Sequence, residues 1–200
     1  MNNLELAIID VETSGISAVR DRIIEVAVLR ISEGALTEQS STLVNPERPI
    51  PLYIERLTGI TNEDLRGAPP FREIKEDLLR LLEGSIFVAH NARFDYGFIR
   101  KEFERERIAF SAKCLCTVRL SRRLFPGYRR HNLDSIITRF DLDCVNRHRA
   151  IGDALVLWDF LRILRTKTDA GTLNEALAML VGTPALPAPV DGPIGCGPSP

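Results

Sequence analysis

Five residues combine side chains and positions that suit metal-dependent hydrolysis: Asp10, Glu12, Asp95, His148 and Asp153. Four carboxylates that converge on one point can hold two hard divalent cations, Mg²⁺ or Mn²⁺, through oxygen ligands. Two such cations, about 3.5–4 Å apart, stabilise the attacking and the leaving oxygen of an in-line phosphoryl displacement. A histidine, whose pKa lies near neutrality, can take the proton from the attacking water. This chemistry requires elements that bring the five side chains together.

Asp10 and Glu12 lie two residues apart at the end of a predicted strand, Leu4–Val11. Side chains alternate along a strand, so both carboxylates point to the same face. Two like charges that are buried together are costly unless a cation binds between them. The pair therefore indicates a metal site, although one of the two acids could instead cap the following turn.

Asp95 follows a predicted buried strand, Ser85–His90, and lies at the start of a predicted helix, Arg93–Arg107. The carboxyl ends of strands are where α/β sheets assemble their sites. The alternative is an acid in the first helical turn that is favoured by the helix dipole alone.

His148 and Asp153 are five residues apart, so on one helix they would diverge by roughly 140°. The spacing suits a site if His148 lies in the loop before the predicted helix Arg149–Leu164 and Asp153 projects from its second turn. Asp153 would then be a fixed carboxylate, and the imidazole would be free to move toward solvent and substrate. The alternative is an ordinary surface histidine.

The remaining pattern predicts an α/β domain with a mixed sheet. Strands are expected at Leu4–Val11, Ile23–Ile31, Ala35–Val44, Ser85–His90 and Cys114–Val118. Helices are expected at Tyr53–Leu57, Asn62–Leu65, Phe71–Leu82, Arg93–Arg107, Asn132–Phe140 and Arg149–Leu164. A last short helix is expected to begin with the capping box Thr172 and Glu175. The folded domain would cover residues 1–181, followed by a flexible tail, residues 182–200, with six prolines and four glycines.

The composition argues against a disordered chain and against a membrane protein. The chain has 200 residues, of which 44% are hydrophobic and 26% charged, and its mean hydropathy is −0.03. No apolar run approaches the ~20 residues that span a bilayer, and the polar first residues do not form a secretory signal. Four cysteines show no spacing typical of a disulfide framework or zinc site. We therefore expect a cytoplasmic protein with reduced thiols.

The charge is distributed unevenly along the chain. The net charge is −1, yet residues 113–149 contain nine Lys and Arg against three acids. A locally basic segment can hold a polyanion on one face of an acidic protein, although it can equally be a solvated surface.

Three segments resemble, in order and with appropriate intervals, the exonuclease motifs of the DEDD superfamily. They are Asp10-Val11-Glu12-Thr13, His90-Asn91-Ala92-x-Phe94-Asp95 and His148-x4-Asp153. Two supporting segments are Leu57-Thr58-Gly59-Ile60-Thr61 and His131-Asn132-Leu133-Asp134. The histidine is typical of the DEDDh branch, which includes ribonuclease T and the proofreading epsilon subunit of bacterial DNA polymerase III. The resemblance covers roughly residues 4–165.

The resemblance implies a ribonuclease H-like fold, with the mixed sheet flanked by helices, and a 3′–5′ exonuclease acting on DNA. Asp10, Glu12, Asp95 and Asp153 would ligate two Mg²⁺ or Mn²⁺ ions, with Asp10 bridging both, and His148 would be the general base. The product would be a nucleoside 5′-monophosphate. Two alternatives stay open: an exoribonuclease that trims RNA 3′ ends, and an inactive module that binds nucleic acid.

The resemblance also suggests substrate contacts. The terminal nucleotide would meet Thr13, Asn91 and an apolar wedge of Leu57 and Ile60, although a turn cap (Asn91) or a core role (Leu57, Ile60) is an equal alternative. The basic segment, with Arg129, Arg130 and His131, would track the backbone of single-stranded DNA or a frayed 3′ end. A DNA polymerase subunit is an expected partner. The glutamine-bearing motif that binds sliding clamps is not found, since Gln39 is the only glutamine.

Overall fold

The structure, a computed structural model, describes residues 4–145 and 147–182. Its centre is a five-stranded sheet in the order β3-β2-β1-β4-β5. The strands are β1 (Leu6–Thr13), β2 (Ile23–Ser32), β3 (Ala35–Leu43), β4 (Ile86–Ala89) and β5 (Cys114–Cys116). β2 is antiparallel to β1 and β3, whereas β1, β4 and β5 are mutually parallel. The predicted mixed sheet is therefore confirmed.

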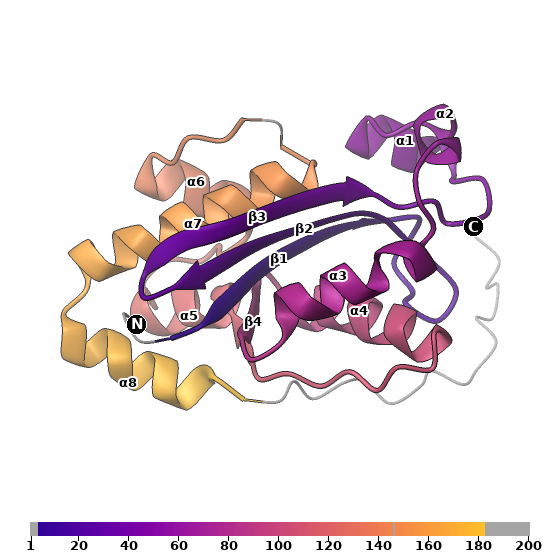
Figure 1. Cartoon of the computed structure of the whole chain (residues 1–200). Coiled ribbons are helices and arrows are strands. Elements are labelled where there is room, and N and C mark those ends of the chain that lie inside the picture. Colours follow the sequence, from indigo (N-terminus) through magenta and orange to yellow (C-terminus); the bar gives the residue numbers. More distant parts are fainter. Residues whose placement is uncertain (1–3, 146, 183–200) are drawn as a thin grey trace, which may run out of the picture.

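The described residues form helices on both faces of this sheet. They are α1 (Leu52–Thr58), α2 (Asn62–Arg66), α3 (Phe71–Leu82), α4 (Arg93–Arg105), α5 (Thr117–Leu124), α6 (Leu133–Phe140), α7 (Ala150–Lys167) and α8 (Ala170–Leu180). In Figure 1, α3 and α4 lie on one side of the sheet and α6 and α7 on the other, with α1 and α2 beyond the end of β3.

Alternation along β1 decides which layer each side chain meets. Leu6 and Ile8 belong to the core that includes α5, α6, α7 and α8. Ala7, Ile9 and Val11 belong to the opposite core, with α3 and α4. Residues 10 and 12 continue the first series, so the strand directs them toward the α7 layer.

The sequence prediction did not include α5, and it placed the start of α8 at a different residue. The strand expected at Cys114–Val118 ends at Cys116, because α5 begins at Thr117. The arginines of α5 lie on its solvent face, and Leu120 is buried beneath it. The last helix begins at Ala170 rather than at Thr172. Its N-cap is Asp169, whose carboxylate accepts a hydrogen bond of 2.8 Å from the Thr172 amide.

The chain beyond α8 is described only to Gly182, which pairs with Cys114 at the edge of β5. The predicted tail therefore lies outside the described residues, apart from Gly182. The cysteines of the described part, Cys114, Cys116 and Cys144, are free thiols. Within that part, no helix has both the length and the apolar character needed to cross a membrane.

Candidate active site

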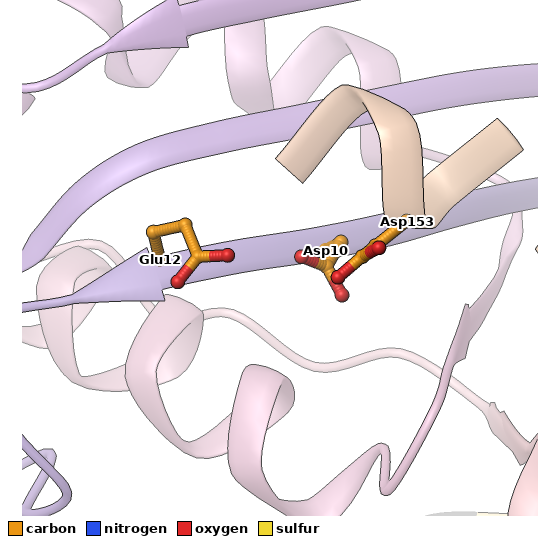
Figure 2. Close-up of side chains that lie close together, drawn as sticks. All are labelled: Asp10, Glu12 and Asp153. Carbon is orange, nitrogen blue, oxygen red and sulfur yellow. The ribbon is translucent and has the colours of Figure 1, made fainter. Parts of the chain in front are cut away.

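Three predicted carboxylates meet on the α7 side of the sheet. Oxygens of Asp10, Glu12 and Asp153 lie within 4.8 Å of one another. Figure 2 shows Asp10 and Glu12 projecting from the same side of β1 toward Asp153. Asp153 lies in the first turn of α7, rather than the predicted second turn, because the helix begins at Ala150 and not at Arg149.

Asp95 approaches from the opposite layer. It lies in the first turn of α4 and is 4% exposed. Its Oδ1 accepts a hydrogen bond of 3.3 Å from the backbone N–H of Val11, between Asp10 and Glu12 on β1. Its charge is one of the causes that raise the pKa of Asp10. We call Asp10, Glu12, Asp95 and Asp153 the acid cluster.

The acid cluster holds more negative charge than its surroundings compensate. Burial, followed by the charges of Asp95 and Asp153, raises the pKa of Asp10 well above its ordinary value. Burial and then the Asp153 charge raise the pKa of Glu12 to about 8. Burial raises the pKa of Asp95 to about 7, and burial also raises the pKa of Asp153, against the Arg147 charge. A bound cation would relieve this repulsion.

The donor set fits a hard divalent cation. All the converging atoms are carboxylate oxygens, the ligands that Mg²⁺ and Mn²⁺ prefer. Asp153 is 6% exposed, and within the described residues its buried Oδ1 has no hydrogen-bond partner. A buried oxygen in this state is costly unless a ligand meets it.

His148 lies just before α7, in the predicted loop position. It is exposed, and its φ of 61° places it in the left-handed region. It is not a member of the acid cluster, but its charge lowers the pKa of Asp153. The structure therefore places His148 directly before α7, five residues before Asp153, with its side chain open to solvent.

Three charged residues of this region were not identified from the sequence: Glu25, Arg147 and Arg149. Arg147 pairs with Asp153 and its Nε lies 2.9 Å from Asp134 Oδ1. Glu25 of β2 is 2% exposed and accepts from Arg149 Nη2 at 2.7 Å. The sequence could have drawn attention to Glu25, because it is the single acid within the apolar run 23–29.

The residues expected near a terminal nucleotide are divided between surface and core. Thr13 is buried, and its hydroxyl donates to the Gly15 carbonyl at 2.6 Å. Asn91 is exposed with a φ of 66°. Leu57 is 53% exposed, whereas Ile60 is 2% exposed and packs in the small core of α1 and α2. Ile60 is therefore a core residue, as the alternative interpretation of the sequence expected.

The basic segment is also divided. Arg129 and Arg130 are exposed. His131 is buried, and its ring nitrogens contact Ser121 Oγ at 2.8 Å and the Tyr128 carbonyl at 2.9 Å. A cleft of about 700 Å³ is lined by residues that include Asn91, Arg93, Arg119, Arg122, His131 and Asn132. Arg93, Arg119 and Arg122 are exposed and form no ion pair within the described part of the chain.

Comparison with known proteins places this geometry among nucleases. A family model described as an exonuclease (RNase_T) matches residues 7–161. The 3′-5′ exonuclease DinG of Bacillus subtilis is 38% identical over 171 residues, which are 82% of this chain and 18% of DinG. A PolC-type DNA polymerase III of Streptococcus agalactiae is 32% identical over 179 residues, which are 87% of this chain and 12% of the polymerase. The chain thus spans less than a fifth of these relatives.

Solved structures with a similar fold are also exonucleases. Exonuclease X in complex with 5′ overhanging duplex DNA is 27% identical, with a TM-score of 0.66 over 86% of this chain and 98% of that one. Escherichia coli exonuclease I in complex with a dT13 oligonucleotide has a TM-score of 0.76 at 18% identity, over 88% of this chain and 44% of that one. The expected ribonuclease H-like fold, with helices flanking the mixed sheet, is confirmed.

Proposed function

Because the chain belongs to the exonuclease family, we propose that it is a metal-dependent 3′–5′ exonuclease that releases nucleoside 5′-monophosphates from DNA 3′ ends. The observation that carries the proposal is the acid cluster, with three carboxylates within 4.8 Å and the fourth hydrogen-bonded to the same strand. The cluster would hold two Mg²⁺ or Mn²⁺ ions, with Asp10 between them. Bound there, the ions would neutralise charge on the attacked phosphate.

His148 supplies the proton transfer in this proposal. Its imidazole is exposed and precedes the helix that carries Asp153, so it could accept the proton of the attacking water. Asp95 fixes the end of β1 through the Val11 amide, which keeps Asp10 and Glu12 in place. Leu57 packs against the terminal base, and Asn91 and the turn at Thr13 contact the terminal nucleotide.

The DNA strand that leads away from the site would follow the arginines around the cleft. Arg93, Arg119 and Arg122 surround it, and Arg129 and Arg130 extend the positive surface. Such contacts bind phosphates without reading sequence. His131 supports this surface from below through Ser121, and reaches a phosphate only if one of its hydrogen bonds breaks.

DNA is the proposed substrate because the structural neighbours named above are complexes with DNA, and because PolC-type relatives are DNA polymerases. A role in proofreading or repair, with a DNA polymerase subunit as partner, follows from the same relatives. RNA trimming uses the same five catalytic residues, so the two substrates must be compared directly.

The decisive experiment is a degradation ladder on 5′-labelled single-stranded DNA and RNA of matched sequence, with Mg²⁺, Mn²⁺ or EDTA. We expect stepwise shortening of DNA ahead of RNA, dependent on the cation. The Asp10→Ala protein, purified in parallel, excludes contaminating nucleases. Faster RNA shortening would transfer the proposal to an exoribonuclease, and no shortening of either strand would contradict an active enzyme.

A further inference from the structure

The backbone at His148 is held by an arginine on each side. Arg147 pairs with Asp153 of the acid cluster. Arg149 donates to Glu25 through Nη2 at 2.7 Å and through Nε at 3.1 Å. His148, between them, has a φ of 61°, which a non-glycine residue keeps only where its surroundings impose it.

Glu25 fixes more than the Arg149 side chain. Its second oxygen, Oε2, accepts a hydrogen bond of 2.9 Å from the backbone N–H of Ala150, the first residue of α7. Glu25 lies on β2 directly opposite Glu12 of β1, and it is 2% exposed. One carboxylate on the rigid sheet thus holds both the residue after His148 and the start of the helix that carries Asp153.

We propose that Glu25 is a positioning residue for His148, acting through Arg149 and the Ala150 amide. This inference rests on the proposed function. Within the described residues the His148 side chain forms no hydrogen bond, so its place depends on the backbone that Glu25 secures. A displacement of about 1 Å at a reacting group can lower the rate roughly 100-fold.

The test is Glu25→Gln, which keeps the shape and one acceptor oxygen but removes the charge. We expect kcat on single-stranded DNA to fall about 10- to 100-fold. KM and the dissociation constant for Mn²⁺, measured by calorimetry, should change much less than kcat, because all four carboxylates of the acid cluster remain, even though Glu25 also contributes to the charge around Glu12. Hydrogen exchange at the Ala150 amide, measured by NMR, should be faster in the variant than in the wild type.

Arg149→Gln should produce the same loss, and the double variant should lose no more than either single variant. Glu102→Gln is the matched control, since Glu102 is also buried and bonded to an arginine and to a backbone amide. It should lower the unfolding temperature but leave kcat unchanged well below that temperature.

Four results would overturn the inference. Glu25→Gln could lower only the unfolding temperature, as Glu102→Gln should, or its loss of kcat could add to that of Arg149→Gln. Full activity of Glu25→Gln beside an active wild type would reject the positioning role of Glu25 and leave the proposed function standing. An inactive wild type would reject the proposed function and, with it, the role of Glu25.

Discussion

Two groups of buried carboxylates in this molecule have opposite surroundings. In the acid cluster, only Asp153 forms an ion pair among the described residues, with Arg147, and the pKa of every member is raised. Glu25 and Glu102, which we call the paired glutamates, each accept from an arginine and from a backbone amide. Burial of a charge is tolerated when partners meet it. Arginines therefore compensate the charges of the paired glutamates, although Glu102 Oε2 is buried without a hydrogen-bond partner among the described residues. The acid cluster has four acids and one arginine partner, which suits a bound cation.

The largest expected effect follows from removing one charge of the acid cluster. Asp10→Asn should lower kcat by about 10³-fold or more, because the two proposed metal ions lose a carboxylate ligand. The reaction then loses several kcal/mol of transition-state stabilisation. The ladder assay on single-stranded DNA measures this loss. Calorimetry with Mn²⁺ should show weaker binding in parallel.

The same variant should stabilise the metal-free protein, because a like charge is removed from a buried site. Differential scanning calorimetry in EDTA should show a higher unfolding temperature, by roughly 2–4 °C for each kcal/mol gained. An Asp10→Asn protein that is less stable than the wild type in EDTA would contradict the contrast between the two groups.

The second effect concerns the proton acceptor beside the acid cluster. His148→Asn should lower kcat by roughly 10²–10⁴-fold while Mn²⁺ binding is largely retained. Asparagine suits this test better than alanine, because asparagine tolerates the left-handed backbone found here. Single-turnover kinetics and calorimetry separate the two quantities, and near-normal turnover would reject His148 as the general base.

The sequence predicted that the four carboxylates converge, and the structure brings them together, whereas their role as metal ligands stays a prediction. Alternation along one strand places Asp10 and Glu12 on one face, and motif spacing adds Asp95 and Asp153. Glu25 and Arg149 are 124 residues apart, and only the packing of α7 on β2 joins them. A long-range ion pair leaves no periodic signal in the sequence. The one sign of it was a single acid, Glu25, within an apolar strand.

The errors in the fold have similar causes. The five residues from Cys114 to Val118 are too few for periodicity to separate a strand from the start of a helix. At α8 two residues could cap the helix, and the structure uses Asp169 rather than Thr172. Ile60 packs with Ile24 of β2 and with the apolar residues of α1 and α2. His131 is held by Ser121 and Tyr128, and its residue type alone does not reveal these contacts.

The third effect tests the paired glutamates. Glu102 Oε1 accepts from Arg22 Nε at 2.8 Å and lies 3.0 Å from Arg105 Nη1, and its side chain is 1% exposed. Glu102→Gln should therefore lower the free energy of unfolding by about 1–3 kcal/mol. Urea denaturation of the variant and wild type measures the difference, and a variant as stable as the wild type would show that this pair does not support the fold.

The smallest expected effect is a pH dependence of stability that the acid cluster should produce. The pKa values of Glu12, about 8, and Asp95, about 7, lie above their ordinary values of 4.5 and 3.8, so the native chain holds more protons than the unfolded chain near neutrality. Stability then falls as pH rises. Burial lowers the pKa of His90 to about 4, so His90 acts in the opposite direction. Its contribution diminishes above about pH 6.5, where the unfolded His90 loses its proton.

The unfolding temperature in EDTA should accordingly decrease between about pH 6.5 and about pH 8. Excess Mg²⁺ should raise it most at the upper end, because the cation binds the ionised carboxylates that repel one another. Glu12→Gln is the control, since it removes one of the acids with a raised pKa and should flatten the decrease. A temperature that stays level in the wild type would mean that the acid cluster is already compensated, and the contrast with the paired glutamates would be lost.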